Sequence, residues 1–478
     1  MTDSTPWMNA HSPLPAYTTT SWLAPVRVAA QSLRDSQRMV SQYVLVIESG
    51  VDESKNINTT TLALNFDATD DPKIDLNYTI REYPSDFRIQ RNDVWYPRAA
   101  GIGGCTIHNA MDNGIGGLRQ TFDKISGWFN DSSWTRDNMQ KYFALLERNL
   151  YLTPPNPDHG LIFDGWLRTI RAPVNFSTTD PQWEAVGNAA IAAAGPLIED
   201  INSHLPLPRS ARGLTATGKL EFNLTSLSFK LSGIGDSAQL KKLGIPTVVD
   251  MPGVGSNLQD NDEIPVFWEL QQNFTDPEKY FQHLPMLRRW SPISTRISSR
   301  KSSLGLSVIT ASTPNFLTIV NLKAMTSSKG YVRLTTSHPQ DLLDINKLRF
   351  QAPGGQEDIE ALREGVKRWR KIINTNADLQ NHLVREVSPG GNVTTDEDLE
   401  NFILEHVFAH HACCTNAIGP DGDPQAVLDG EFKVRGVRNL RVVDASSWPE
   451  IPGYFPTSPA YMMAEKAAQV ILKEANKV

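Results

Sequence analysis

The fold is decided by the C-terminal stretch His410-His411-Ala412-Cys413-Cys414-Thr415-Asn416-Ala417-Ile418-Gly419, which continues to Val442-Val443-Asp444-Ala445-Ser446 and Ala464-Glu465-Lys466. It predicts two imidazoles ahead of an apolar strand that ends in an acid and turns into a helix. Imidazole has the unperturbed pKa nearest neutrality, so it can take or give a proton at working pH. A strand, an acid, a turn and a helix in this order commonly aim backbone amides at a cofactor. This block therefore predicts a proton acceptor beside a cofactor site.

The composition limits the classes of protein to which the chain can belong. A chain of 478 residues is long enough for two or three domains around large cores. Its 40% apolar and 21% charged residues are an ordinary globular mixture. The formal net charge of -7 leaves no basic surplus to neutralise phosphates, which argues against a nucleic-acid partner. No apolar run approaches the roughly 20 residues that span a bilayer, so we expect no membrane partner either.

The N-terminus and the cysteines favour a cytoplasmic location. Residues Met1–Asn9 lack the basic and apolar regions of a secretory signal. Three cysteines, with Cys413 and Cys414 adjacent, do not make a disulfide framework. The sequons at Asn77 and Asn130 suit a secreted ancestor, and without a signal they carry little weight.

A second cofactor feature is the run Tyr43-Val-Leu-Val-Ile-Glu48, which predicts a buried parallel strand. Glu48 is placed to hydrogen-bond a ribose hydroxyl, as acids at this point do in dinucleotide folds. The alternative is that Glu48 merely ends a strand at the surface. The G-x-G-x-x-G turn expected about 20 residues earlier is missing. Residues 1–40 are Ser/Thr/Pro-rich at first, and a helix is predicted around Val26–Met39.

A glycine-rich segment, Tyr96–Met111, lies ahead of a helix-like run at Trp134–Phe143. Clustered glycines let the backbone approach a flat or anionic ligand closely. Thr106 and Asn109 add polar contacts to such a site. A lone glycine cluster is more often an ordinary loop, and its place before a helix raises its weight only modestly.

The middle of the chain predicts an antiparallel sheet with covering helices. Thr318–Ala324 and Tyr331–Thr335, joined by Ser327–Gly330, predict a hairpin. Thr395–Asp398 predicts a capping box that starts a short helix. A longer amphipathic helix is predicted by apolar residues spaced three and four apart: Ile359, Leu362, Val366, Trp369 and Ile373. This order of elements indicates an α+β substrate domain inserted into an α/β cofactor domain.

Together these motifs resemble the GMC (glucose–methanol–choline) oxidoreductases. The blocks that carry the resemblance are Val44–Glu48, Pro97–Met111, Leu231–Asp260, Ser328–Leu334 and His411–Lys466. Members of that family are flavoproteins that bind FAD in a discontinuous Rossmann-type domain capped by an antiparallel substrate domain. The resemblance implies an FAD domain at 41–265 and 401–478 and a substrate domain at 266–400. Residues 1–40 would be an atypical segment in place of the first βα unit.

The resemblance also implies roles for single residues. Glu48 would bind the adenosine ribose, and His411 matches the family's catalytic base by its spacing to Gly419, in preference to His410. No metal ligands are expected. The remaining residues implied to lie along FAD are Gly104, Thr106, Asn109 and Ala110, with Asp444 and Ala445 near the isoalloxazine ring. The implied activity is oxidation of an alcohol in a small organic metabolite, with the histidine taking the proton and the flavin the hydride.

The sequence departs from the family at three places. Residues 1–40 do not supply the family's glycine-containing strand–turn–helix, and the span from Gly218 to Leu231 is short. The position of a second catalytic His or Asn falls on Phe455, which cannot hydrogen-bond a substrate oxygen. Losing the turn removes several bonds to the pyrophosphate, each worth about 1.5–3 kcal/mol. Two other interpretations therefore stay open: a non-redox relative that performs acid/base cyclisation or dehydration, and an inactive, truncated member.

Overall fold

The structure is a computed structural model. It describes residues 20–23, 44–47, 50–61, 65–108, 118–153, 156, 165–169, 180–194, 197–198, 212–213, 225–273, 293–296, 306–313, 315–454 and 456–475. The helices are α2 Ile57–Thr60, α3 Asn65–Thr69, α4 Leu118–Phe129, α5 Arg136–Leu146, α6 Pro181–Ala194, α7 Thr225–Leu231, α8 Ser237–Lys242, α9 Gly355–Thr375, α10 Ala377–Gln380, α11 Asp396–His406 and α12 Thr457–Ala475. Short 3₁₀ turns are η2 Gly104–His108, η3 Ser132–Trp134 and η7 Ala445–Ser447.

The strands belong to one large sheet and several small ones. The large sheet contains β7 Leu197–Ile198, β8 Arg212–Gly213, β11 Asp262–Leu270, β12 Ile293–Arg296, β13 Leu306–Thr313, β14 Phe316–Lys323 and β17 Leu383–Ser388. The two-stranded sheets pair β1 Thr20–Leu23 with β2 Val44–Ile47, β3 Tyr78–Ile80 with β4 Val94–Tyr96, β5 Glu147–Asn149 with β6 Leu167–Thr169, β9 Ile234–Gly235 with β10 Val249–Asp250, and β15 Tyr331–Arg333 with β16 Asp344–Asn346.

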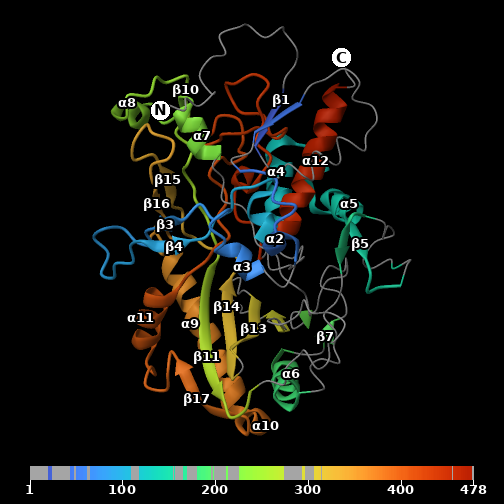
Figure 1. Cartoon of the computed structure of the whole chain (residues 1–478), viewed down its shortest axis with the longest axis vertical. Helices are drawn as coiled ribbons and strands as arrows, with labels where there is room; N and C mark the ends of the chain where they lie inside the picture. Colours follow the sequence, from blue (N-terminus) through green and yellow to red (C-terminus); the bar gives the residue numbers. More distant parts are fainter. Residues whose placement is uncertain are drawn as a thin grey trace, which may run out of the picture.

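The seven-stranded sheet occupies the lower part of the molecule (Figure 1), in the order β17-β11-β14-β13-β12-β8-β7. Its neighbouring strands are antiparallel except β7 and β8. In β11 the even positions Ile264, Val266, Trp268 and Leu270 are buried, as a strand with one covered face requires. Most of this sheet comes from the region where the sequence predicts a substrate domain. The domain boundaries themselves stay a prediction.

Helix α9 packs against β11 and β14, and α11 packs against α9 (Figure 1). The predicted amphipathic helix is confirmed, since all five residues of its apolar face are buried: Ile359, Leu362, Val366, Trp369 and Ile373. Gly365 allows the helix to approach the sheet, because a Cβ there would lie 3.1 Å from Oδ1 of Asn321. The predicted capping box is also confirmed, with Thr395 Oγ1 accepting from Asp398 N at 3.0 Å and the reciprocal bond at 3.2 Å.

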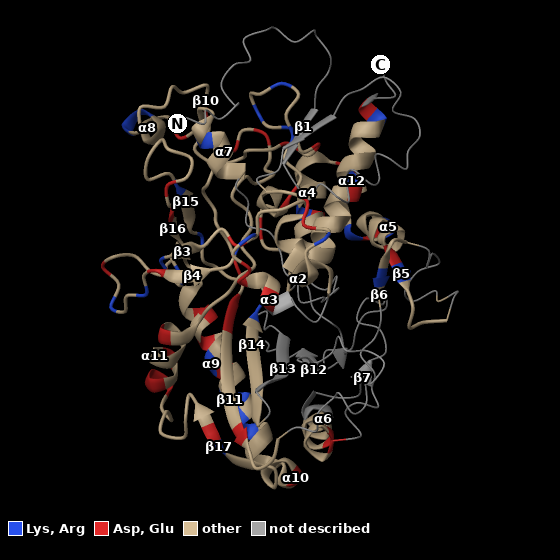
Figure 2. Cartoon of the chain, in the orientation of Figure 1, with Lys and Arg blue, Asp and Glu red and all other residues tan. Residues whose placement is uncertain are grey.

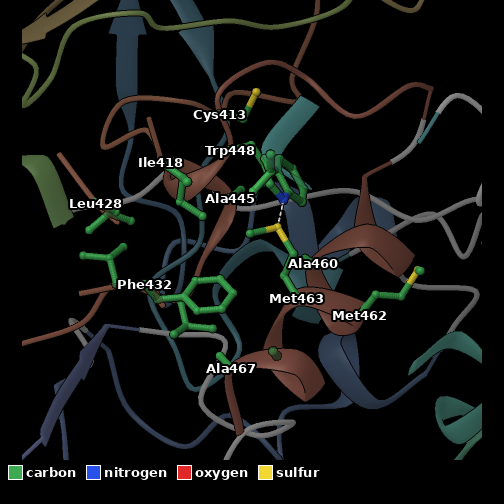
Figure 3. Packing of buried hydrophobic residues seen from close by; sticks show 14 of the residues in the cluster. Cys413, Ile418, Leu428, Phe432, Ala445, Trp448, Ala460, Met462, Met463 and Ala467 are labelled. Atoms are coloured by element: carbon green, nitrogen blue, oxygen red, sulfur yellow. Dashed lines mark hydrogen bonds between the residues drawn. The ribbon is translucent and has the colours of Figure 1, made fainter. Parts of the chain in front are cut away.

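A second core surrounds α12, which lies in the upper part of the molecule (Figure 1), and Figure 3 shows the packing of its side chains. Its Trp448 indole donates a hydrogen bond to the sulfur of Met463, and Phe432 packs beside Trp134 at 5.3 Å. Cys413 is buried in the same cluster and comes from the segment that carries the histidine pair. Packing therefore holds that segment on its C-terminal side. The cysteines are buried free thiols. No helix in the described part of the chain has the length and hydropathy of a membrane crossing.

The strand predicted at Tyr43–Glu48 is confirmed at Val44–Ile47. It pairs in parallel with β1, from Thr20↔Val44 to Leu23↔Ile47. An earlier parallel strand therefore lies within residues 1–40, although the sequence showed no strand–turn–helix there. The run around it, Thr18-Thr-Thr-Ser-Trp-Leu23, is rich in β-branched residues, which favour strands even without clear apolar alternation. The helix predicted around Val26–Met39 lies outside the described residues.

The predicted hairpin is wrong. Strand β14 pairs with β11 and β13, whereas β15 pairs with β16 in a separate sheet. The segment between β14 and β15 contacts α9, because the backbone N–H and the hydroxyl of Ser327 both donate to Asp358 Oδ2 at 2.7 Å. These contacts replace the tight turn that would close a hairpin.

The apolar strand predicted before Asp444 is also wrong. Val442 and Val443 are buried, yet neither belongs to a regular strand. Arg441 makes an isolated bridge with Lys433, and the N–H of Val442 donates to the carbonyl of Phe432 at 3.1 Å. The apolar run is buried by a neighbouring loop and by the α12 core, so its burial pattern mimics that of a buried strand.

Candidate active site

The structure describes six of the predicted site residues. They occur in three places: η2, the loop 407–419, which we call the histidine loop, and η7 with its cap. The described residues are Gly104, Thr106, His410, His411, Asp444 and Ala445. Glu48, Asn109, Ala110 and Phe455 lie outside the described residues.

The glycine-rich segment lies directly against the chain that follows β2. A Cβ on Gly50 would lie 2.3 Å from the carbonyl carbon of Ala100, so glycine is required at this contact. The N–H of Ile102 donates to the carbonyl of Val51 at 3.1 Å. The chain that follows β2 and the glycine-rich segment are therefore neighbours in space.

Gly104 and Thr106 are held by the turn to which they belong. Gly103 and Gly104 have φ of 108° and 50°, a backbone conformation that favours glycine. The N–H of Gly104 donates to the carbonyl of Gly101 at 2.7 Å. The Thr106 hydroxyl donates to the carbonyl of Gly103 at 2.6 Å. The backbone shape of η2 is therefore fixed by its own hydrogen bonds.

Asp444 caps η7 from within the fold. Its Oδ1 accepts from the N–H and the hydroxyl of Ser446 at 2.7 and 2.6 Å, and its Oδ2 accepts from the Thr225 hydroxyl at 2.8 Å. The carbonyl of Ala445 accepts from the N–H of Cys414 at 3.0 Å, and that of Ser446 from the N–H of Asn416 at 2.8 Å. The histidine loop and η7, predicted to act together, are therefore one hydrogen-bonded unit.

The two histidines converge on a single carboxylate. The side chain of His411 is 1% exposed, that of His410 is 15% exposed, and their rings meet edge to face at 4.3 Å. Oε1 of Glu263 lies 3.4 Å from Nδ1 of His411 and 3.8 Å from Nε2 of His410. Glu263 is itself buried, at 6% side-chain exposure. We call these three residues the His–His–Glu cluster.

Main-chain hydrogen bonds fix both ends of this cluster. Glu263 and Phe408 exchange N–H to carbonyl bonds of 2.8 and 3.0 Å. Gln259 and Cys413 exchange another pair, of 3.2 and 2.9 Å. The start of β11 therefore runs antiparallel to the histidine loop. These two pairs of hydrogen bonds flank His410 and His411 in the histidine loop. They fix the backbone from which the three side chains of the cluster project.

Asp260 lies at the centre of a buried polar network beneath the cluster. Its Oδ1 accepts the N–H of His411 at 2.7 Å, and its Oδ2 meets Lys347 Nζ at 2.7 Å and the hydroxyl of Tyr96. Burial acts to raise the pKa of Asp260, but the charges of Lys347 and Arg349 outweigh burial and lower it to about 2. Asp260 is therefore ionised at neutral pH and holds the backbone of His411.

Cationic side chains bind the carbonyls of the histidine loop. Lys347 Nζ donates to Ala409 at 3.1 Å, and Arg98 donates to the carbonyl of His410. Figure 2 shows the acidic positions in red at the upper end of β11, where Asp262 and Glu263 begin the strand. Asp262 contacts Arg349, which also binds Glu82 at 2.5 Å.

Sequence reasoning missed Glu263, Asp260 and Lys347. A signal was present in Asp260-Asn-Asp-Glu263, where three acids stand at the start of an apolar strand. Acids at the edge of a buried run need cations or hydrogen-bond donors, so they mark a polar site inside the fold. Nothing in the sequence pairs those acids with Lys347 or with the histidines, because the contacts join distant segments.

Comparisons with known proteins show which family the chain resembles. Residues 326–464, which include the histidine pair and Asp444, match the GMC oxidoreductase family. The oxygen-dependent choline dehydrogenase of Vibrio vulnificus is 30% identical over 280 residues, and the mitochondrial choline dehydrogenase of Homo sapiens is 32% identical over 275. Residues 326–464 are therefore a GMC oxidoreductase domain. The two matches to relatives cover 51% and 50% of this chain, and 48% and 45% of the relatives, so the chain spans about half their length.

Solved structures share the fold of this chain. Formate oxidase of Aspergillus oryzae superimposes with a TM-score of 0.78 at 18% identity, covering 96% of this chain and 99% of that one. A pyridoxine 4-oxidase superimposes with a TM-score of 0.75 at 19% identity, covering 94% of this chain and 98% of that one. The mixed α/β architecture is therefore shown.

Proposed function

We propose that this chain oxidises an alcohol group of a small organic molecule, with FAD as its cofactor. The observation that carries the proposal is the His–His–Glu cluster, in which a buried carboxylate faces the ring of His411 at 3.4 Å. That cluster lies partly within the region that matches the family, whose named relatives include choline dehydrogenases. An imidazole held in this way is a suitable proton acceptor at neutral pH.

The described residues around β2 and the glycine turn fit FAD. The parallel pair β1 and β2 brings two carboxyl ends to one edge, where open α/β sheets bind nucleotides. The glycine turn lies against the end of β2, as a shared ligand requires. Within this proposal Glu48 holds the ribose. The residues placed along the cofactor are Gly104, Thr106, Asn109 and Ala110, with Asp444 and Ala445 near the ring.

The chain's own residues would handle the proton. Bound FAD would accept the hydride that leaves the alcohol carbon. A proton on Nδ1 of His411, directed at Glu263, leaves Nε2 to accept the hydroxyl proton of the substrate. The carboxylate then stabilises the imidazolium that results. His410 packs its edge against His411 and restrains the ring. Because Phe455 supplies no polar group, the substrate oxygen depends on the histidine pair.

A non-redox activity is the second candidate. The observation that favours it is the lack of closely spaced glycines upstream of Glu48, which weakens the pyrophosphate site. In that case the same proton acceptor would serve a cyclisation or dehydration. The two candidates differ in whether the purified protein takes up flavin.

Flavin absorbance of the purified chain, with and without added FAD, tests the proposal. We expect a yellow protein whose colour bleaches when small primary or secondary alcohols are added without oxygen. A colourless protein that takes up no added FAD would contradict the proposal. Turnover without colour would favour the non-redox candidate.

A variant pair tests the role of His411. His411→Ala should keep flavin binding and slow bleaching by about 10²–10⁴-fold, the usual contribution of a general base. His406→Ala is the matched control, because His406 ends α11 and its ring Nδ1 contacts the carbonyl of Phe402 at 2.9 Å, outside the cluster. Equal bleaching rates in the two variants would remove His411 from the mechanism.

A further inference from the structure

We propose that Glu263, His410 and His411 form a binding site for a divalent transition-metal ion, with Zn²⁺ as the preferred occupant. No metal ligands are expected from the sequence, in which Glu263 is far from the two histidines. The fold brings one ligand atom of each within 4.8 Å of the others.

The distances suit tetrahedral coordination. Zinc binds imidazole nitrogen and carboxylate oxygen at about 2.0–2.2 Å, which places neighbouring ligand atoms about 3.3–3.5 Å apart. The observed separations from Glu263 Oε1 are 3.4 Å to His411 Nδ1 and 3.8 Å to His410 Nε2. Binding an ion would shorten the longer separation by about 0.3 Å. Two histidines and a glutamate leave a fourth position open, as in hydrolytic zinc sites.

The surroundings hold the ligands in place. The N–H of His411 is bound by Asp260, and the carbonyl of His410 is bound by Arg98. Such outer contacts orient metal ligands and strengthen binding, since less order is lost when the ion arrives. The acids beside the cluster are paired with cations: Asp260 with Lys347, and Asp262 with Arg349. Glu263 is the acid whose carboxylate faces both imidazoles.

The donor set selects the class of ion. Imidazole nitrogen suits zinc, cobalt, nickel and copper, whereas Mg²⁺ and Ca²⁺ prefer oxygen ligands in larger numbers. A site with two nitrogens and one carboxylate therefore excludes the second group. Entry is through His410, the most exposed of the three ligands.

The metal and the proton would compete for the same place. In the proposed reaction a proton lies between Glu263 and Nδ1 of His411, where the ion would bind. When the ion is bound, His411 is therefore a weaker base and the enzyme is inactive. This consequence rests on the proposed function, whereas the binding site itself does not.

A cobalt titration of the full chain, dialysed against EDTA, tests the binding site. Co²⁺ bound by four or five ligands including imidazole absorbs strongly in the red part of the visible spectrum, beyond flavin absorption. We expect one Co²⁺ per chain with such a spectrum, displaced by one Zn²⁺. Glu263→Gln should weaken binding by more than about 100-fold, beyond the effect of losing an outer contact.

Matched controls keep the result interpretable. Glu269→Gln makes the same change on β11 at a residue that pairs with Arg385, and it should leave cobalt binding unchanged. His410→Asn removes a second ligand and should act like Glu263→Gln, which covers the case in which one variant fails to fold. A weak octahedral spectrum, or equal affinity in wild type and folded Glu263→Gln, would overturn the proposal. The titration needs no substrate, so its failure is distinguishable from failure of the redox proposal.

Discussion

Asp260 shows how one buried charge can position the side chain of His411, the proposed proton acceptor, by binding the backbone of the same residue. It binds the backbone N–H of His411 at 2.7 Å and Lys347 Nζ at 2.7 Å. A buried carboxylate is costly unless such partners satisfy it, so removing the charge leaves Lys347 buried without its partner. Asp260 is therefore a positioning residue for the histidine loop.

We predict that Asp260→Asn lowers the free energy of unfolding by about 3–5 kcal/mol, the usual cost of breaking a buried ion pair. It should also slow flavin bleaching without abolishing flavin uptake, because the His411 ring is displaced and not removed. Urea unfolding and anaerobic bleaching measure the two effects. Asp378→Asn is the control, since that side chain is 65% exposed and should change stability by less than about 0.5 kcal/mol. A stable Asp260→Asn with normal bleaching would contradict the positioning role.

At the scale of elements, α11 connects the sheet to the histidine loop. The helix begins with the Thr395 capping box and ends at His406, one residue before the loop. Its inner face packs on α9. The cap therefore supports the N-terminal side of the histidine loop, while the α12 core supports its other side.

We predict that Thr395→Ala lowers the free energy of unfolding by about 1 kcal/mol, because the N–H of Asp398 loses its acceptor. Hydrogen exchange should rise first in α11. Thr375→Ala provides the comparison: that hydroxyl is exposed at the end of α9 and donates to the carbonyl of Lys371 at 2.8 Å. A loss of stability that is equal in both variants would show that the cap contributes nothing.

Local features were predictable from the sequence, and long-range pairings were not. The apolar stripe of α9 and the cap of α11 depend on residues within one or two turns, so spacing alone reveals them. The predicted hairpin at Ser327–Gly330 is wrong because Ser327 donates hydrogen bonds to Asp358, which lies on the later helix α9. Strand β1 was missed because Thr20–Leu23 has a strand propensity but no alternation.

The residues of the candidate site show the same difference between local features and long-range contacts. The histidine loop and η7 come from the same C-terminal block of sequence, so the hydrogen bonds that join them were predictable as an association. Glu263 joins them from the start of β11, and that contact depends on the pairing of β11 with the histidine loop. A sequence shows acids at the start of a strand but not which loop will lie beside them.

At the scale of the whole molecule, a buried ion network connects distant segments. It consists of Glu82, Asp260, Asp262, Lys347 and Arg349. Glu82 follows β3, Asp260 precedes β11 and Asp262 begins it, and the two cations follow β16. The network also reaches the histidine loop through Asp260. Acid that neutralises these carboxylates should therefore weaken the molecule as a unit.

The acid dependence follows from the pKa of Asp260. Burial acts to raise it, and the charges of Lys347 and Arg349 lower it from 3.8 to about 2, so the folded protein binds this proton less readily than the unfolded chain. The stabilisation is therefore full above pH 3.8 and is lost as pH falls toward about 2. We predict that the stability difference between wild type and Asp260→Asn, measured by urea unfolding, is constant near neutrality and narrows as the pH falls through this range. A difference that stays constant down to the lowest pH at which both fold would show that the ionised form of Asp260 does not hold the network together.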